Sequence, residues 1–113
     1  LGNAGSFFRN PIIGAETYAA LQTRWPDIPA FATSTADVKV PAAWLIDRAG
    51  WKGVRRGAVG VHDKQALVLV NHGGGTGQQV LALAREIVAS VEQMFGVQLQ
   101  PEVCLLPAPA GGL

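Results

Sequence analysis

Apolar side chains recur every three or four positions between residues 76 and 95, which is the spacing of one face of an α-helix. Thr76 and Gln79 stand three residues apart at the start of this stretch. That is the spacing of a capping box, in which each side chain bonds a free backbone amide. Gly96 supplies a stop. The pattern predicts a long amphipathic helix with one buried face.

Two shorter helices are predicted nearer the N-terminus. The first covers residues 15–24 and ends before Pro26, which cannot continue a helix. The second covers residues 41–49 and ends at Gly50. It starts with Pro41 at the first helical position, where the missing amide would have had no partner.

A wholly apolar run at residues 66–70 predicts a strand that lies mid-sheet and is covered on both faces. The link between residues 61 and 66 is too short for a helical crossover, so we expect an antiparallel hairpin. Other strand candidates are residues 6–10, 38, 58–62, 98–100 and 103–106. The sequence therefore predicts a single α+β domain in which helices pack on a mixed, largely antiparallel sheet.

The chain has 113 residues, of which 49% are hydrophobic, and a formal net charge of +1. That charge excludes a general attraction to nucleic acid, and no apolar run is long enough to span a membrane. The single cysteine, Cys104, cannot form an internal disulfide. Residues 1–11 lack the features of a signal peptide, so we expect a soluble, cytoplasmic domain. The chain has no initiator Met, and we expect it to be cut from a longer protein.

The glycine-rich stretch at residues 73–77 joins the apolar strand to the long helix, a place where backbone amides can bind phosphate. Gln78 and Gln79 follow where a Walker loop needs Lys and then Ser or Thr. The pattern therefore favours glycines that merely turn the chain. A stand-alone nucleotide-sugar or phosphate-binding module that uses Gly73 to Gly77 remains the alternative, and a structural domain without a ligand is a third. His62 and His72 have no metal-ligand spacing, so no metal site is predicted.

Ser6 lies between a small, flexible entry and two aromatic residues, and Asn10 follows four positions later. On an extended strand these two side chains share one face and could contact the same ligand. An ordinary edge strand after a glycine-rich turn would give the same spacing.

Five segments in order along the chain resemble the C-terminal, substrate-binding domain of the MurB family. They are GNAGSFFRNP at residues 2–11, AWLID at 43–47, GWKG at 50–53, QALVLVN at 65–71 and PEV at 101–103. Members of the family are UDP-N-acetylenolpyruvoylglucosamine reductases, flavoproteins that make UDP-N-acetylmuramate for bacterial peptidoglycan. The resemblance covers nearly the whole chain.

The resemblance implies a role for five residues. Ser6 matches the family's proton donor, and Glu102 matches the acidic residue at the carboxylate end of the enolpyruvyl group. Glu102 suits that place only if its pKa is raised enough to keep it protonated. Asn10, Lys52 and Gln65 match positions that bind the uridine diphosphate part of the substrate.

The resemblance also implies that residues 1–106 form the substrate-binding domain, with a loose tail at 107–113. The FAD-binding domains of the same protein would lie N-terminal to this chain, and NADPH would be the reductant. We expect no cofactor on this segment by itself, and no reductase activity without the flavin domains.

Overall fold

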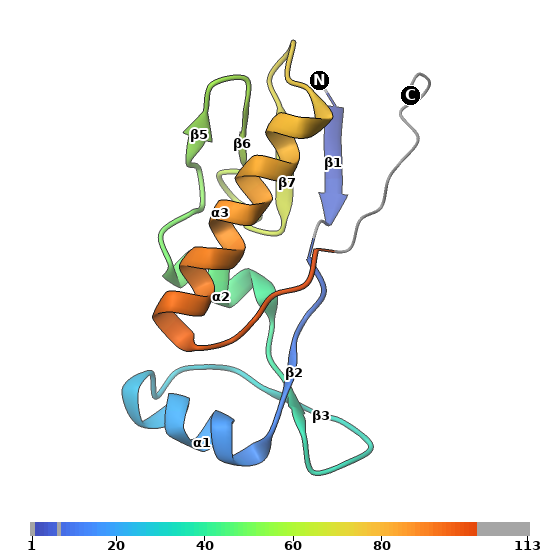
Figure 1. The fold of residues 1–113 in the computed structure, drawn as a ribbon. Coiled ribbons are helices and arrows are strands. Elements are labelled where there is room, and N and C mark those ends of the chain that lie inside the picture. The colour runs from blue at the N-terminus through green and yellow to red at the C-terminus, as the bar shows by residue number, and fades with distance from the viewer. Residues whose placement is uncertain (1, 7, 102–113) are drawn as a thin grey trace.

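In the part of the chain that the structure describes, the fold consists of three helices and two antiparallel sheets (Figure 1). The computed structural model describes residues 2–6 and 8–101, the first of these stretches by its backbone. The elements in order are β1 (Gly2–Ser6), β2 (Ile12–Ile13), α1 (Ala15–Arg24), β3 (Phe31–Ala32), β4 (Val38–Lys39), α2 (Ala42–Arg48), β5 (Arg55–Arg56), β6 (Val59–Val61), β7 (Val68–Asn71) and α3 (Gly77–Phe95). The α+β prediction is confirmed, and every strand pair in the described part of the chain is antiparallel.

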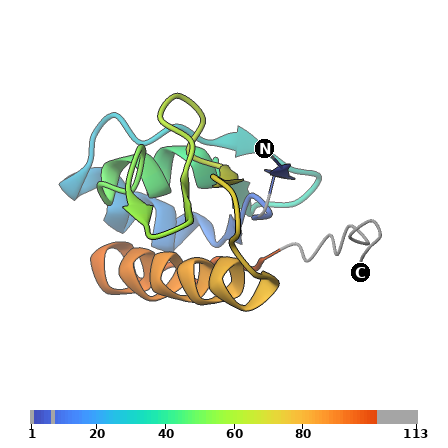
Figure 2. The same ribbon diagram turned by 90° about the horizontal axis from the view of Figure 1, so that it is seen from above.

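The larger sheet has the order β1-β7-β6-β5. The predicted hairpin is confirmed, since β6 and β7 pair antiparallel with Val61 opposite Leu69. The predicted central strand is confirmed as well, because β7 has β1 on one edge and β6 on the other. Helix α3 lies along one face of this sheet (Figures 1 and 2).

Helix α3 has the ends that its sequence predicts. The Thr76 side chain accepts from the Gln79 amide at 3.2 Å, and the Gln79 side chain accepts from the Thr76 amide at 2.8 Å. At the other end Gly96 takes a left-handed conformation with φ 69°, which costs glycine little. The buried face of the helix includes Leu83 and Ile87, which pack in one core with Leu69.

Cover on the second face of β7 is incomplete, which corrects the prediction of a strand buried on both sides. Leu69 is fully buried, but its neighbours Val68 and Val70 are only half-buried. Successive side chains of a strand point to opposite faces, so Val68 and Val70 face away from α3. The described residues provide a long helix for one face only, and the other face is left partly open.

The N-terminal strand lies at Gly2–Ser6, four residues earlier than the predicted strand at residues 6–10. A regular strand ends at Ser6, and Phe8 makes only an isolated bridge with Pro101. Among the described residues, 98–100 form no regular strand, while 103–106 lie outside the described residues. The chain instead continues into the small sheet β2-β4-β3, whose two-residue strands are too short to leave a periodic pattern.

Helix α1 has the predicted bounds, and it is anchored to the rest of the fold at two points. The Tyr18 hydroxyl donates to the Ile28 carbonyl at 2.6 Å. The rings of Trp25 and Phe95 lie 4.6 Å apart, centroid to centroid, at the C-terminal end of α3. The first contact ties α1 to the loop that follows it, and the second joins the C-terminal ends of α1 and α3.

Helix α2 begins one residue later than predicted, with Pro41 as its N-cap. Proline has no side-chain acceptor for the free amides of the first turn. Asn10 supplies one from 32 positions away, since its Oδ1 accepts from the Ala42 amide at 2.9 Å. The predicted stop is confirmed by Gly50, which has φ 89° and donates its amide to the Asp47 carbonyl at 2.9 Å.

This capping bond makes Asn10 a contributor to stability. We expect Asn10→Ala to lower the free energy of unfolding by about 1 kcal/mol, because the Ala42 amide loses its acceptor. Asn10→Asp retains an acceptor oxygen and should lose less. Urea unfolding followed by circular dichroism measures both. Equal losses in the two variants would contradict the capping role.

Candidate functional site

A pocket of about 530 Å³ opens between α2 and the turn that joins β6 to β7. Both Lys52 and Gln65, two of the residues predicted to bind substrate, line it. The other lining residues are Pro41, Ala43, Trp44, Asp47, Lys64, Ala66, Leu67 and Val68. Folding therefore brings two residues that are 13 positions apart to one opening.

The polar side of the pocket carries more positive than negative charge. The Lys52 ammonium lies 3.2 Å from the Asp47 carboxylate, and both side chains are substantially exposed, at 36% and 52%. An ion pair exposed to this degree is weak, so an anionic ligand can compete for the ammonium. Lys64 adds a second ammonium at the same opening.

The remaining wall is apolar and includes Trp44, Leu67 and Val68. Most ligand pockets combine such a wall with a few convergent polar groups that set the ligand's orientation. The Trp44 ring packs against Phe95 at 5.8 Å between centroids, and the Arg48 guanidinium lies 4.9 Å from its centre. Trp44 is thereby fixed in the wall. The arrangement suits an anionic ligand with a substantial organic part.

Strand β1 pairs Ser6 with a residue of the pocket wall. Ser6 is paired across the sheet with Val68, which lines the pocket. The register between the two strands shifts between Asn3 and Ser6, so this pairing includes an irregularity of the kind that often lies beside functional sites. Ser6 is thus one strand away from the pocket wall.

The end of the described chain returns to the same region. Phe8 forms a bridge with Pro101, and the Arg9 amide donates to the Gln100 carbonyl at 3.0 Å. Glu102 itself lies outside the described residues. Pro101, the residue before Glu102, therefore pairs with Phe8, which is only two positions beyond Ser6. The two segments are far apart in the sequence.

Asn10 is not among the residues that line the pocket. Its side-chain oxygen, Oδ1, caps α2, and the first turn of that helix supplies Ala43 and Trp44 to the pocket wall. Sequence reasoning missed this role, because the spacing within a single strand says nothing about a helix 32 positions away. It also missed Asp47 and Lys64, although both stand within or beside the segments that carry the resemblance.

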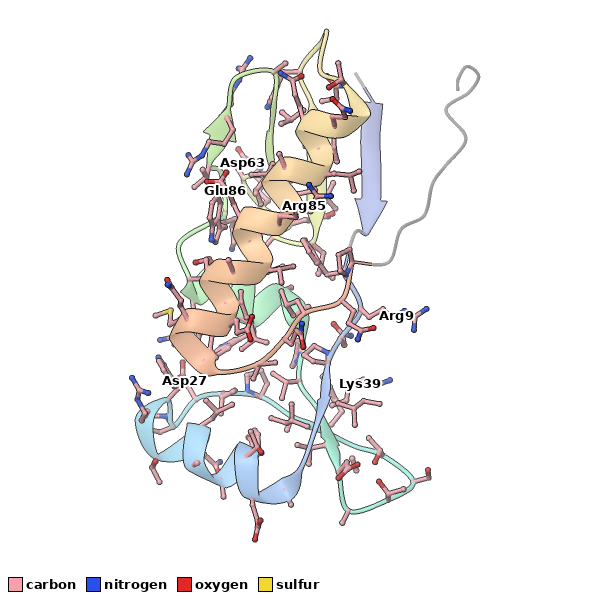
Figure 3. The ribbon with its side chains drawn as sticks, viewed as in Figure 1. Arg9, Asp27, Lys39, Asp63, Arg85 and Glu86 are labelled. Carbon is pink, nitrogen blue, oxygen red and sulfur yellow. The ribbon has the colours of Figure 1, made fainter. Side chains whose placement is uncertain are left out.

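Three of the four basic residues in the segment from Arg48 to Arg56 are each paired with a carboxylate. Arg48 pairs with Asp27, and Lys52 pairs with Asp47. The Arg56 guanidinium lies 3.3 Å from Glu86, which α3 presents on the side of β5 (Figure 3).

Three of the five backbone amides in the glycine-rich loop at residues 73–77 donate hydrogen bonds to side chains of this chain. Asn71 Oδ1 accepts from the amides of Gly73 at 2.9 Å and Gly75 at 3.1 Å. The amides of Thr76 and Gln79 are taken up by the capping box. A β-carbon on Gly75 would lie 2.7 Å from Val59, so this glycine serves close packing. The loop's geometry argues against the alternative of a phosphate-binding module.

No three His, Cys, Asp or Glu side chains in residues 2–6 and 8–101 are grouped so that they could hold a metal ion. Over the same part of the chain, none of the helices combines the length and the apolar character needed to cross a membrane.

Comparison with known proteins agrees with the resemblance seen in the sequence. A family model described as UDP-N-acetylenolpyruvoylglucosamine reductase, C-terminal domain, matches residues 1–106. The reductase of that name from Porphyromonas gingivalis is 58% identical over 103 residues, which are 91% of this chain and 30% of the relative. The one from Burkholderia cenocepacia is 58% identical over 106 residues, covering 93% of this chain and 30% of the relative.

A third relative of the same name, from Chromobacterium violaceum, is 55% identical over 106 residues, which are 94% of this chain and 31% of the relative. The chain thus spans about 30% of the length of the curated relatives that it matches. The family model and the relatives agree over nearly all of the chain. The chain therefore belongs to the UDP-N-acetylenolpyruvoylglucosamine reductase family, in which it matches the C-terminal domain.

Proposed function

We propose that the chain binds UDP-N-acetylenolpyruvoylglucosamine as the substrate domain of an FAD-dependent reductase, which uses NADPH to form UDP-N-acetylmuramate. One observation carries the proposal: the pocket that contains Lys52 and Gln65 borders the strand pair of Ser6 and Val68. Binding groups and the proposed proton donor thus belong to one region. The reaction belongs to peptidoglycan precursor synthesis, and we assign it to the bacterial cytoplasm.

The chemistry of the pocket suits the diphosphate and its nearest rings. Lys52 and Lys64 offer cations to the phosphate oxygens, and the Gln65 amide has both a donor and an acceptor. Asp47 holds the Lys52 ammonium at the opening until an anion replaces it. Asn10 contributes through α2, whose wall it supports.

We assign the proton-transfer step to Ser6. Addition of hydride to the enolpyruvyl methylene leaves a negative charge that spreads from the adjacent carbon into the carboxylate. A neutral hydroxyl is acidic enough to protonate so basic a carbon when it lies within about 3 Å, and a positioned donor of this kind contributes about 100- to 10,000-fold. Glu102, in its protonated form, would assist at the carboxylate.

The described residues of this chain do not fit a flavin site. The amides of Gly73, Gly75 and Thr76 in its glycine-rich loop are engaged within the chain, and the pocket beside α2 carries two lysines that suit the phosphates of a nucleotide sugar. We therefore assign FAD, the source of the hydride, to the rest of the protein. The reaction then takes place where the substrate domain meets the flavin domains.

Removal of the pocket's charge tests substrate binding. In the complete protein that contains this chain, we expect Lys52→Ala to raise the Kd for the UDP-sugar about tenfold or more, since a charge-assisted contact is lost. Gln65→Ala should raise it less. Lys39→Ala is the matched control, because Lys39 lies on β4 outside this pocket (Figure 3). Calorimetry measures all three, and equal effects of the two lysine variants would contradict the assignment.

Replacement of the proposed donor tests the chemistry. Ser6→Ala in the complete protein should lower kcat about 100- to 10,000-fold, because no group remains to protonate the carbon. Its Kd for substrate should change little, while Ser6→Cys should recover part of the rate. Stopped-flow measurement of substrate reduction gives the rate, and calorimetry gives the Kd for substrate. A normal kcat in Ser6→Ala would exclude the role.

The isolated chain gives a separate test of the assignment of FAD. We expect it to purify without colour, to leave NADPH unoxidised when substrate is added, and to bind the UDP-sugar weakly at best. Absorbance at 450 nm on the purified chain, before and after addition of FAD, measures flavin binding. A yellow protein would refute the assignment of FAD to the rest of the protein.

A further inference from the structure

His62 sits at the start of the turn that carries Lys64 and Gln65 into the pocket. Its Nδ1 accepts hydrogen bonds from both of their backbone amides, at 3.0 Å from Lys64 and 3.2 Å from Gln65. An imidazole nitrogen can accept only when it carries no proton, so these bonds require a neutral ring with its proton on Nε2. Two backbone amides of the turn are therefore bonded to an unprotonated nitrogen of one side chain.

The backbone of the same residue joins the two sides of the pocket. The His62 carbonyl accepts from the Gly53 amide at 3.3 Å, next to Lys52. The His62 amide donates to the Val68 carbonyl at 2.8 Å. His62 is thus bonded to the segment beside Lys52, to strand β7, and to the turn that carries Gln65.

We infer that His62 is a positioning residue of the substrate pocket, whose neutral imidazole holds Lys64 and Gln65 in place and whose protonation loosens them. The inference rests on the proposed function, because it concerns binding of the UDP-sugar in that pocket. It adds a pH-sensitive element to the site. Histidine suits such an element because its charge commonly changes between pH 5 and 8.

Asp63 gives the protonated ring another partner. Its Oδ1 lies 3.5 Å from His62 Nδ1, and its side chain is mostly exposed. A proton on Nδ1 turns an acceptor into a donor, which favours this carboxylate over the two amides. The other charged or titratable groups on this side are Arg55 and His72, which line a second hollow of about 520 Å³ together with His62 and Asp63. Lys64 is the basic residue of the turn itself.

The sign of the pH effect separates positioning from simple electrostatics. A protonated imidazole adds positive charge near the pocket, which by itself would strengthen binding of an anionic ligand. Loss of the turn's hydrogen bonds would weaken binding instead. The positioning role therefore predicts weaker binding in acid, whereas a purely electrostatic role predicts tighter binding.

The test is calorimetric titration of the complete protein with UDP-N-acetylenolpyruvoylglucosamine at pH 8.0 and 5.5. We expect the unsubstituted protein to bind about tenfold more weakly at pH 5.5, an effect comparable to the loss of one or two hydrogen bonds. His62→Ala should bind about tenfold more weakly at both pH values. At pH 8.0 and saturating substrate, the kcat of His62→Ala should equal that of the unsubstituted protein.

Two variants complete the design. His62→Asn places an acceptor oxygen at the same number of bonds from the backbone as Nδ1, and it cannot be protonated in this range. It should bind like the unsubstituted protein at pH 8.0 and lose nothing at pH 5.5. His72→Ala removes the other imidazole that lines the second hollow. It should stay within twofold of the unsubstituted protein and retain the pH dependence.

Tighter binding at pH 5.5, equal behaviour of the two alanine variants, or failure of asparagine to restore affinity would each overturn the inference. If His62→Ala does not fold, the pH dependence of His62→Asn decides alone. Absence of any UDP-sugar binding by the unsubstituted protein would instead refute the proposed function, and this inference with it.

Discussion

Strand β7 has to satisfy its backbone hydrogen bonds on both edges while one of its faces is buried under α3. Leu69 is fully buried with Leu83 and Ile87, so a slip of one residue would turn Leu69 out of the core. Burial of each such side chain contributes about 1.5 to 3 kcal/mol, which fixes the register of β7. The positions of β1 and β6 follow from that register, because both pair directly with β7.

The pocket is a consequence of this arrangement. With Leu69 turned inward, Val68 faces the open side of the sheet, where α2 and the β6–β7 turn enclose it. The same register puts Ser6 opposite Val68. The pairing of Ser6 with Val68 therefore places the proposed proton donor beside a pocket that Lys52 and Gln65, the residues proposed to bind substrate, also line.

The sequence was most informative where one strong local pattern decided the structure. Capping residues and apolar spacing predicted α3 nearly to its ends, and the short link after Val61 predicted the hairpin. In the smaller sheet only the strand that begins at Val38 was predicted. The other two strands were missed, because strands of two residues have no period to detect. The capping of α2 by Asn10 was also missed, because a contact across 32 positions leaves no local signal.

Prediction of the site was limited in the same way. The resemblance to a family supplied Ser6, Lys52 and Gln65, and the fold supplied the reason that they lie in one region. Roles that depend on three-dimensional contacts, such as the pairing of Asp47 with Lys52, could be recognised only from the structure.

A crystal structure of the complete protein with UDP-N-acetylenolpyruvoylglucosamine bound tests the central claim most directly. We expect the diphosphate within hydrogen-bonding distance of Lys52 in the pocket between α2 and the β6–β7 turn, and the Ser6 hydroxyl within about 3 Å of the enol ether carbon. A substrate bound instead at the glycine-rich loop before α3, remote from Lys52 and Ser6, would contradict the account.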